Sequence, residues 1–290
     1  MEDDACVRFL QWLLPQLRMR YPGFRKVRKQ VCKRIQRHIK QLNLSDAKAY
    51  QHYLEIHPDE WFIVDKLCRV TISRFYRDKV VLEHISKDVL PVLAQAAITS
   101  GETIIRGWSA GCAAGEEVYS LVLMWDRLLS NHFPELDIQV IGTDIDQYML
   151  DRAIEACYSY SSIKALPKEW VDSVFSQQEG VFCLDSRLRN KATFTEQDIR
   201  QSLPTDTFHI IFCRNLAFTY FENSLQLEVL ENIRSCLVDG GALIIGGHES
   251  LPRDYSGFCH WPGQRAIFRK CSRYNTRSKS AQPHCFPSKT

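Results

Sequence analysis

Hydrophobic residues in the first quarter of the chain recur at helical spacing. In the clearest stretch, apolar side chains fall every three or four positions, at Val27, Val31, Ile35, Ile39 and Leu42. This period marks one face of an amphipathic helix. Ser45 is placed to cap a following helix, with Asp46 in its first turn, where a carboxylate is favourable. We therefore predict an all-helical N-terminal domain over residues 1–75.

From about residue 103 the pattern changes to short apolar runs that alternate with amphipathic segments. Strands are expected over residues 103–111, 136–146, 208–215 and 241–250, and helices over 116–132, 147–158 and 223–241. Strands that alternate with helices produce a mostly parallel sheet that is covered on both faces. The pattern predicts an α/β, Rossmann-like domain over residues 76–272.

This alternation is interrupted between Trp170 and Glu196. Short runs with turn residues between them indicate a small antiparallel β-subdomain, inserted over residues 170–197. The chain ends in a polar, proline-containing stretch at residues 273–290, and this composition predicts disorder.

The composition is that of a soluble globular protein. Of the 290 residues, 45% are hydrophobic and 24% are charged, and the formal net charge is +3. No apolar run approaches the ~20 residues that cross a bilayer, and the acidic N-terminal stretch lacks the basic residues of an export signal. We expect a cytoplasmic protein without membrane insertion. The small net charge does not support nucleic-acid binding.

The 11 cysteines are odd in number and scattered along the chain. No CxxC pair and no cysteine–histidine cluster has the spacing of a zinc site, so we expect no structural metal. Cys112, Cys157 and Cys213 stand beside apolar residues, as buried free thiols do. This cysteine usage indicates a reducing, intracellular compartment.

Basic residues crowd one of the predicted N-terminal helices. Residues 25–40 contain lysines and arginines at many positions and no acidic residue. Like charges on one helix repel one another modestly. Three interpretations remain open: a solvated face, a docking surface for an acidic protein partner, and a contact with nucleic acid or lipid.

A glycine-containing loop follows the first strand of the α/β domain. Gly111 and Gly115 supply only two of the three glycines of a dinucleotide-binding loop, and the next two residues, Glu116 and Glu117, would repel a pyrophosphate. The second strand ends near Asp144, where a carboxylate can accept both hydroxyls of an unphosphorylated ribose. S-adenosylmethionine carries a sulfonium, an ammonium and a ribose but no phosphate, so it suits this loop better than NAD.

Simpler roles exist for the same residues. The loop can be a structural turn, and Glu117 can stabilise a helix N-terminus. Asp144 or Asp146 can cap a helix. The residues alone leave these alternatives open.

Several motifs occur together and in a fixed order along the chain. They are "VTISRFYRD", "WSAGCAAGEEVYSL", "IGTDID", "AIEACYSYSSIKALP", "FHIIFCRNLAFTYF" and "GGHESL". In these motifs, from the N-terminal helices to about residue 270, the chain resembles the CheR-type chemotaxis-receptor methyltransferases. The resemblance implies methylation of glutamate side chains on receptor helices, with S-adenosylmethionine as cofactor and S-adenosylhomocysteine as product. It also implies a helical domain joined to a methyltransferase domain with a three-stranded β-subdomain.

The resemblance implies roles for individual residues. Arg77 and Tyr220 would be the catalytic residues, which orient an acceptor carboxylate. The cofactor would be held by Thr71, Ser73, Arg77, Gly111, Glu117, Asp144, Asp198, Ile199, Arg214, Asn215 and Leu216. The basic residues 25–40 would face an acidic protein substrate such as a receptor helix.

The chain departs from the family pattern at several positions. One extra residue separates "CRN" from Tyr220, and Asp198 stands where the family usually has asparagine. His209 replaces an aspartate before an apolar strand, and we expect it to be an ordinary strand-edge residue. Two further functions stay open: a methyltransferase for another protein side chain or a small molecule, and a degenerate module that only binds the cofactor or its product.

Overall fold

The computed structural model describes residues 3–253 and 255–271 of the chain. The stretch 273–290, for which the composition predicts disorder, lies outside the described residues. Within the described residues, no helix combines the length and the apolar character that crossing a membrane requires.

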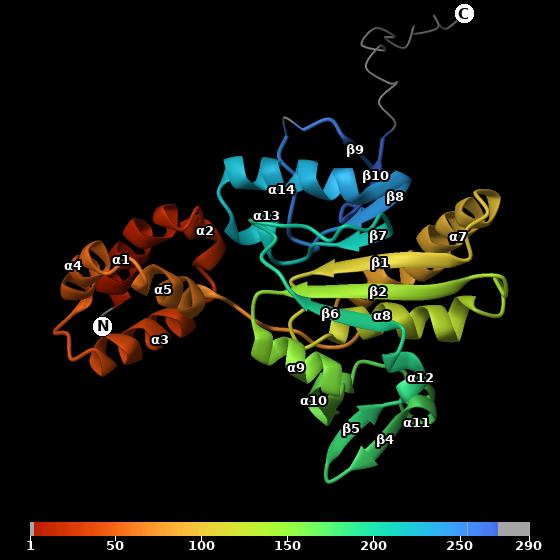
Figure 1. Ribbon diagram of the computed structural model, residues 1–290, viewed down its shortest axis with the longest axis horizontal. Helices are drawn as coiled ribbons and strands as arrows, with labels where there is room; N and C mark the ends of the chain where they lie inside the picture. Colours follow the sequence, from red (N-terminus) through yellow and green to blue (C-terminus); the bar gives the residue numbers. More distant parts are fainter. Residues whose placement is uncertain (1–2, 254, 272–290) are drawn as a thin grey trace, which may run out of the picture.

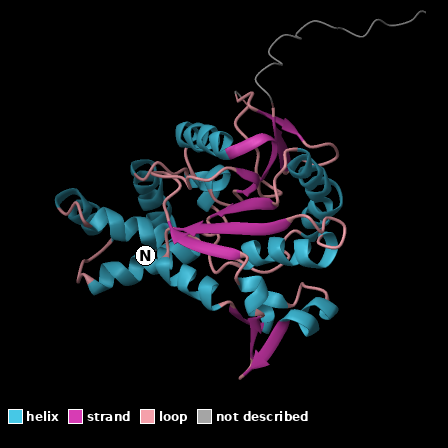
Figure 2. Cartoon of the chain, turned by 45° about the vertical axis from the view of Figure 1, so that its right-hand side comes forward, coloured by secondary structure: helices cyan, strands magenta, loops and turns pink. Residues whose placement is uncertain are grey.

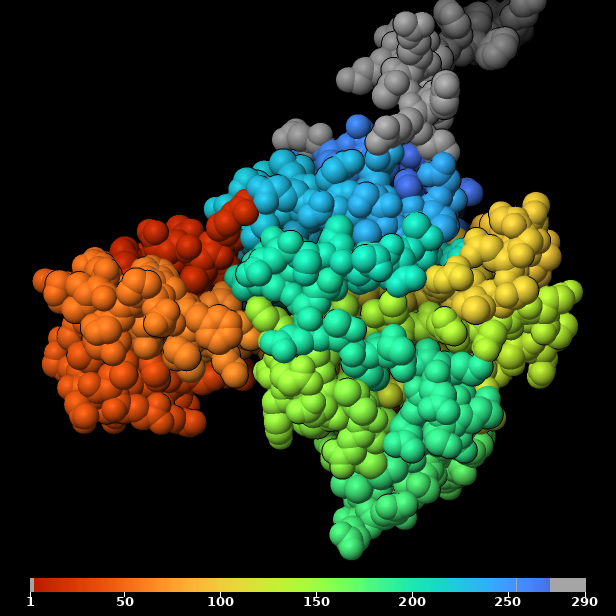
Figure 3. Space-filling view, in the orientation of Figure 1, coloured from red at the N-terminus to blue at the C-terminus, as the bar shows by residue number. Residues whose placement is uncertain are grey.

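The N-terminal part of the chain folds into five helices, which we call the helical unit (red to orange in Figures 1 and 3). These helices are α1 (Asp3–Gln16), α2 (Tyr21–Phe24), α3 (Arg28–Gln41), α4 (Ala47–Ile56) and α5 (Glu60–Cys68). Their apolar faces meet in a core that includes the fully buried Leu10, Ile35 and Tyr50. Ser45 is not the cap of α4, because the Asp46 carboxylate accepts from the backbone N–H groups at positions 48 and 49.

A seven-stranded sheet forms the centre of the rest of the chain. Its strands are β1 (Ile104–Ala110), β2 (Asp137–Asp144), β6 (Ala192–Glu196), β7 (Phe208–Phe212), β8 (Leu237–Ile244), β9 (Phe258–His260) and β10 (Ile267–Lys270). Their order is β6-β2-β1-β7-β8-β10-β9. The first five are parallel, and β10 and β9 are antiparallel to their neighbours. The predicted α/β fold with a mostly parallel sheet is confirmed.

Helices lie on both sides of this sheet (Figure 2). They are α6 (Lys79–His84), α7 (Leu90–Thr99), α8 (Glu116–Met124), α9 (Gln147–Glu155), α13 (Ala217–Tyr220) and α14 (Asn223–Cys236), and π-helical turns extend α6 and α8 over Ile85–Val89 and Trp125–Leu129. Alternate strand residues feed two cores: Ile105 packs with α7 and α8, and Trp108 packs with α14 and the helical unit. The helix predicted over 223–241 ends earlier, because β8 begins at Leu237 and includes Gly240 in a left-handed conformation.

A second, antiparallel sheet of three strands forms the small β-subdomain. It contains β3 (Cys157–Ser159), β4 (Phe175–Gln178) and β5 (Val181–Leu184), with the short helices α10 (Tyr160–Ile163), α11 (Lys168–Val174) and α12 (Ser186–Arg189) around it. The β-subdomain in the structure therefore differs at both ends from the insertion predicted at 170–197. Its first strand comes from before α11, and β6 belongs to the main sheet, where it pairs in parallel with β2. β6 is an edge strand, and its residues alternate between half-buried and exposed, as those of a hairpin strand do.

Six cysteines are paired in the structure. The disulfides are Cys6–Cys32, Cys157–Cys183 and Cys259–Cys271. The expectation of a free thiol is wrong for Cys157, because β3 and β5 place it directly opposite Cys183. Cys112 and Cys213 are free and buried, as predicted.

Candidate active site

A cavity of about 690 Å³ opens at the carboxyl ends of the parallel strands. It is closed on the other side by α2, α5 and the extended segment that leads from the helical unit to α6. All the residues that the motifs single out line it: Thr71, Ser73, Arg77, Gly111, Glu117, Asp144, Asp198, Ile199, Arg214, Asn215, Leu216 and Tyr220. Those from Gly111 onward come together because the loops after parallel strands emerge at the same edge of the sheet. Thr71, Ser73 and Arg77 lie on the extended segment between α5 and α6.

The glycine loop curls tightly over the end of β2. The N–H groups of Gly111 and Cys112 both donate to the carbonyl of Thr143. Gly111 has φ +74°, and a Cβ there would lie 2.8 Å from the side chain of Leu216. A glycine is therefore required, and the loop backbone lies open to the cavity.

Asp144 holds this loop in place from below. Its Oδ2 accepts from the N–H of Ala113 at 2.9 Å, and its Oδ1 accepts from the N–H of Asp146 at 3.0 Å. Burial raises the pKa of this carboxyl, and the two backbone donors oppose the shift. Each oxygen keeps lone-pair capacity for a further donor from the cavity. Asp146 stands at the N-cap of α9 without a side-chain cap bond, so neither aspartate acts as a helix cap.

Only one of the two adjacent glutamates faces the cavity. Glu117 accepts from the Ser109 hydroxyl and from Arg214 Nη1, each at 2.8 Å. Glu116 is buried away from the cavity, where it accepts from Ser162 at 3.0 Å. The expectation that both acids shape the ligand site is wrong, because neighbouring helix residues project about 100° apart.

Arg214 is a buried cation between two acids. Its side chain is 4% exposed and pairs with Glu117 and with Asp78. Burial alone would lower the pKa of Arg214, but Glu117 and then Asp78 raise it above its ordinary value. These two ion pairs fix Glu117 against the wall of the cavity and leave the cluster of Arg214, Glu117 and Asp78 with one net negative charge.

Arg77 and Tyr220 lie on the same cavity. Arg77 donates from Nη1 to the carbonyl of Ile72 at 2.8 Å, and no ion pair joins it to a carboxylate in the part of the chain that the structure describes. Burial raises the pKa of Tyr220, Glu249 adds to this, and Arg77 opposes it. The phenol is therefore protonated at neutral pH and can donate a hydrogen bond. Tyr220 ends the single turn of α13, where its N–H donates to the carbonyl of Leu216 at 2.9 Å.

The helical unit supports the turn that carries Tyr220. The ring of Phe24 packs on Tyr220 with centroids 4.9 Å apart. Arg20 donates to the carbonyls of Thr219 and Phe218 at the start and middle of α13. A Cβ on Gly23 would lie 2.2 Å from the Thr219 carbonyl oxygen, so α2 and α13 are in close backbone contact. No sequence motif identified Arg20, Gly23 or Phe24 as residues near the site.

Glu249, in the "GGHES" segment, holds the "CRN" turn. Its Oε2 accepts from the N–H of Asn215 at 2.9 Å and of Gly246 at 2.5 Å, and its Oε1 accepts from the Thr219 hydroxyl at 2.5 Å. Asn215 has φ +54°, a left-handed conformation that asparagine tolerates. The carboxylate thus joins two loops that line the cavity.

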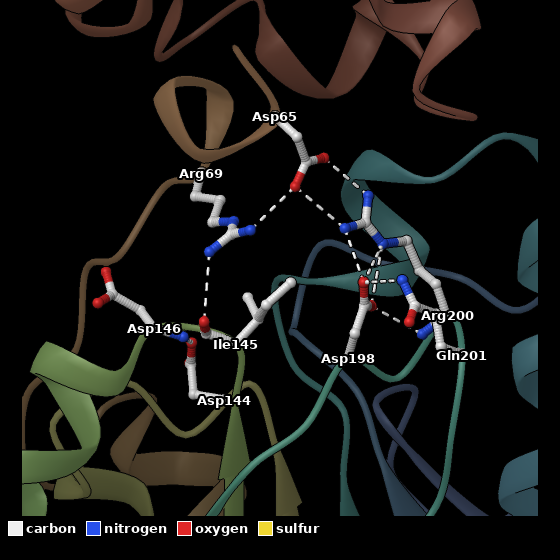
Figure 4. Close-up of polar contacts among 8 residues, drawn as sticks. All are labelled: Asp65, Arg69, Asp144, Ile145, Asp146, Asp198, Arg200 and Gln201. Atoms are coloured by element: carbon white, nitrogen blue, oxygen red, sulfur yellow. Dashed lines mark hydrogen bonds and ion pairs between the residues drawn. The ribbon is translucent and has the colours of Figure 1, made fainter. Parts of the chain in front are cut away.

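Asp198 turns its carboxylate toward Arg200 (Figure 4). Arg200 also pairs with Asp65 of α5, and Asp65 pairs in turn with Arg69. Asp65, Arg69 and Arg200 all line the cavity. Sequence analysis missed these three, because no motif relates residues that lie 135 positions apart.

His209 lies far from the cavity, near the other end of β7. The strand pairs on both sides, with β1 and β8, so His209 is a buried residue of an inner strand and the strand-edge prediction is wrong. Its Nδ1 accepts from the N–H of Arg106 at 3.1 Å, and its Nε2 faces Glu102 at 3.3 Å. Burial lowers the pKa of His209, and Glu102 opposes this.

The cavity suits an extended ligand with hydroxyl or ammonium groups. Glu117 and Asp144 offer carboxylate oxygens, the glycine loop offers an open backbone, and Ile199 and Leu216 offer apolar contacts. A pocket of this volume is in the range for a small organic ligand. The donor set fits S-adenosylmethionine, which presents those groups and carries no phosphate.

Comparison with known proteins identifies the family. Residues 71–267 match the family model described as CheR methyltransferase, SAM binding domain. A probable chemotaxis protein methyltransferase of Rhizobium etli is 30% identical over 228 residues, which cover 76% of this chain and 84% of that protein. Chemotaxis protein methyltransferase 2 of Vibrio cholerae is 31% identical over 237 residues, or 79% of this chain and 80% of that protein. With its site at the strand ends and this match along most of its length, the chain belongs to the CheR methyltransferase family and is an enzyme that uses S-adenosylmethionine.

Proposed function

We propose that this enzyme methylates glutamate carboxylates on an acidic, helical, chemoreceptor-like protein and releases S-adenosylhomocysteine. The observation that carries the proposal is the position of Arg77, which lines the cavity without a carboxylate partner among the described residues. A guanidinium in this position suits an incoming carboxylate. The relatives named above as chemotaxis methyltransferases support the choice of a receptor-like acceptor.

The cofactor half of the cavity would hold S-adenosylmethionine, which supplies an electrophilic methyl group on a sulfonium. We assign the ribose to Asp144 and the ammonium to Glu117. The adenine would lie toward Asp198 and Ile199, and the remaining cofactor contacts are proposed for Thr71, Ser73, Arg77, Gly111, Arg214, Asn215 and Leu216.

The protein's own groups have a limited chemical task. A glutamate carboxylate is already a nucleophile at neutral pH, so no general base is needed. Arg77 would orient this carboxylate through paired N–H donors, and Tyr220 would donate a further hydrogen bond. Phe24 and α13 shield this end of the cavity from water. Arg77 must not bind the carboxylate so tightly that it quenches the nucleophile, because the carboxylate loses its negative charge as the ester forms and its attraction to the guanidinium weakens.

The proposed acceptor surface is a row of basic side chains that begins just before α3 and continues along it, which we call the basic stripe. It consists of Lys26, Lys29, Lys33, Arg37 and Lys40, all exposed and three or four positions apart. Lys26 also lines the cavity, so the stripe leads from the cavity along about 20 Å of helix. Arg28 and Arg34 are not part of it, because they bond to Asp3 and to the carbonyl of Arg69. An acidic helix laid along α3 would meet complementary charge.

The domain division and the cellular location are also proposals. We divide the chain into a helical domain at residues 1–75 and a methyltransferase domain at 76–272, supported by the extended segment after α5. We place the enzyme in the cytoplasm, in keeping with its relatives' role in chemotaxis.

Two measurements test the proposed function. Isothermal titration with S-adenosylhomocysteine should show micromolar binding. Asp144→Asn should raise the Kd at least tenfold, because the amide loses the charge that faces the ribose and its single oxygen can accept from only one of the two loop N–H groups. Methyl transfer to a purified chemoreceptor fragment should then produce label that alkali releases. Alkali-stable label would indicate N-methylation of another side chain. Binding without any transfer would favour a degenerate cofactor-binding module.

A further inference from the structure

Arg200 is clasped between two carboxylates that come from different parts of the chain (Figure 4). Its Nε lies 2.9 and 3.0 Å from the two oxygens of Asp198, which follows β6. Its Nη1 and Nη2 donate to the two oxygens of Asp65, on α5, at 2.8 and 3.1 Å. The guanidinium thus makes a forked contact with the helical unit and a second contact with the α/β domain. Both contacts form only if the two carboxylates are held at defined positions around the planar guanidinium.

A second arginine extends this network to another loop of the cavity. Arg69 donates from Nη2 to Asp65 at 3.1 Å and from Nη1 to the carbonyl of Ile145 at 3.3 Å. Ile145 directly follows Asp144, the proposed ribose residue. Asp65 is therefore the common partner of contacts that reach the loop after β2 and the loop after β6.

The network is largely shielded from water. The side chains of Asp65 and Asp198 are 8% and 10% exposed, and those of Arg69 and Arg200 are 13% and 19% exposed. Burial alone would raise the pKa of Asp65, but Arg200 and then Arg69 lower it below its ordinary value. Asp65 is therefore ionised at neutral pH. Breaking a pair of this kind leaves an uncompensated buried charge, so its geometry is held firmly.

We propose that Asp65 and Arg200 are positioning residues for the cofactor, and that the helical unit sets the shape of the adenosine half of the cavity through them. The proposal rests on the proposed function, which places adenosine at Asp144, Asp198 and Ile199. Neither Asp65 nor Arg200 needs to touch the cofactor. Arg200 holds the Asp198–Ile199 wall, and Asp65 ties that wall and the Ile145 loop to α5.

Another ion pair joins the same two parts of the chain and provides a matched control. Arg18, after α1, pairs with Glu228 of α14 at 2.6 Å. Its members are 44% and 55% exposed, and neither lines the cavity. If loss of contact between the helical unit and the α/β domain were enough to weaken cofactor binding, substitutions in both ion pairs would weaken it. If the effect is specific to the adenosine half of the cavity, only substitutions of Asp65 and Arg200 should weaken cofactor binding.

The experiment is titration of S-adenosylhomocysteine into Asp65→Asn, Arg200→Gln, Arg200→Lys and the control Glu228→Gln, at a temperature where circular dichroism shows all four folded. We expect the Kd to rise about tenfold for Asp65→Asn and Arg200→Gln, less for Arg200→Lys, and less than about twofold for Glu228→Gln. The double variant Asp65→Asn/Arg200→Gln should lose less affinity than the sum of the two single losses, since both single variants remove the contact between Asp65 and Arg200.

Steady-state kinetics separates positioning from a merely structural role. The KM for S-adenosylmethionine should rise, while kcat at saturating cofactor stays close to that of the unaltered enzyme. A lower melting temperature with an unchanged Kd in the folded variants would overturn the inference. A Kd that rises equally in Glu228→Gln would overturn it too. Failure of the unaltered chain to bind S-adenosylhomocysteine would instead overturn the proposed function on which it rests.

Discussion

The two ends of the parallel sheet carry the same kinds of charged residue with opposite consequences. At the amino end, Glu102, Arg106 and His209 bond to one another across β1 and β7. At the carboxyl end, Glu117 and Arg214 follow the same two strands, and they line a cavity of about 690 Å³. The polar groups at the amino end bond to one another, whereas the cluster at the carboxyl end leaves groups available to a ligand.

The difference lies in the connections and not in the residue types. At the carboxyl ends, the chain leaves β1 and β7 through loops with left-handed turns at Gly111 and Asn215, which open the backbone toward the cavity. At the amino end, the acid of Glu102 lies four residues before Arg106 and reaches its guanidinium at 2.9 Å. A buried or half-buried charged cluster is therefore evidence of a site only where the topology leaves it open.

The largest effect on this comparison is expected from Arg77→Ala. If Arg77 orients the acceptor, kcat should fall by about two decades or more, because alignment of the reacting groups is lost. The Kd for S-adenosylhomocysteine should change far less than kcat does. Arg77→Lys keeps the charge but loses the fork of donors. Its kcat should lie between those of the unaltered enzyme and of Arg77→Ala. Full turnover in the alanine variant would remove Arg77 from the catalytic machinery and leave the carboxyl end with binding groups alone.

A smaller effect is expected where the basic stripe leads away from the carboxyl end. Charge reversal of Lys29, Lys33 and Arg37 to glutamate should raise the KM for an acidic acceptor about tenfold at low salt, and added salt should reduce the difference. Cofactor affinity should not change. The control is the same reversal at three exposed lysines off the stripe, Lys48, Lys87 and Lys164. An equal rise in KM in both triple variants would show a general charge effect and count against docking on α3.

The smallest effect on catalysis is expected at the amino end of the sheet. The folded-state pKa of His209 is lowered by burial, so below about pH 6.5 the unfolded chain binds more protons than the folded one. The stability that neutral His209 contributes is complete above that pH, and it is lost as the pH falls from there through the lower folded-state pKa. Protonation would also put a second donor against the N–H of Arg106.

His209→Asn should remove this dependence, because the amide oxygen can accept from Arg106 and does not titrate. Calorimetry at pH 7.5 and 5.5 should show a larger fall in melting temperature for the unaltered chain than for the variant. Turnover at pH 7.5 should stay within about twofold. A large loss of turnover with normal stability would mean that the two ends of the sheet are coupled, and the comparison would fail.

Much of this molecule could be predicted from local patterns. The period of Val31, Ile35 and Ile39 predicted α3, and the alternation of apolar runs with helices predicted the parallel sheet. A strand end followed by an acid was enough to place Asp144 at the cavity. These patterns work because helix faces and strand–helix alternation are written in neighbouring residues.

What only the tertiary structure decided depends on residues distant in the sequence or on exact rotation within an element. The resemblance had singled out Glu117, and the rotation of α8 is what turns its neighbour Glu116 away from the cavity. The pairing of β6 with β2, of Cys157 with Cys183 and of Arg200 with Asp65 joins positions between 26 and 135 or so residues apart. By itself, the sequence determined most of the secondary structure, the family and many of the residues that line the cavity. The fold decided which charges meet, because ion pairs and sheet edges depend on spatial proximity, which no local pattern encodes.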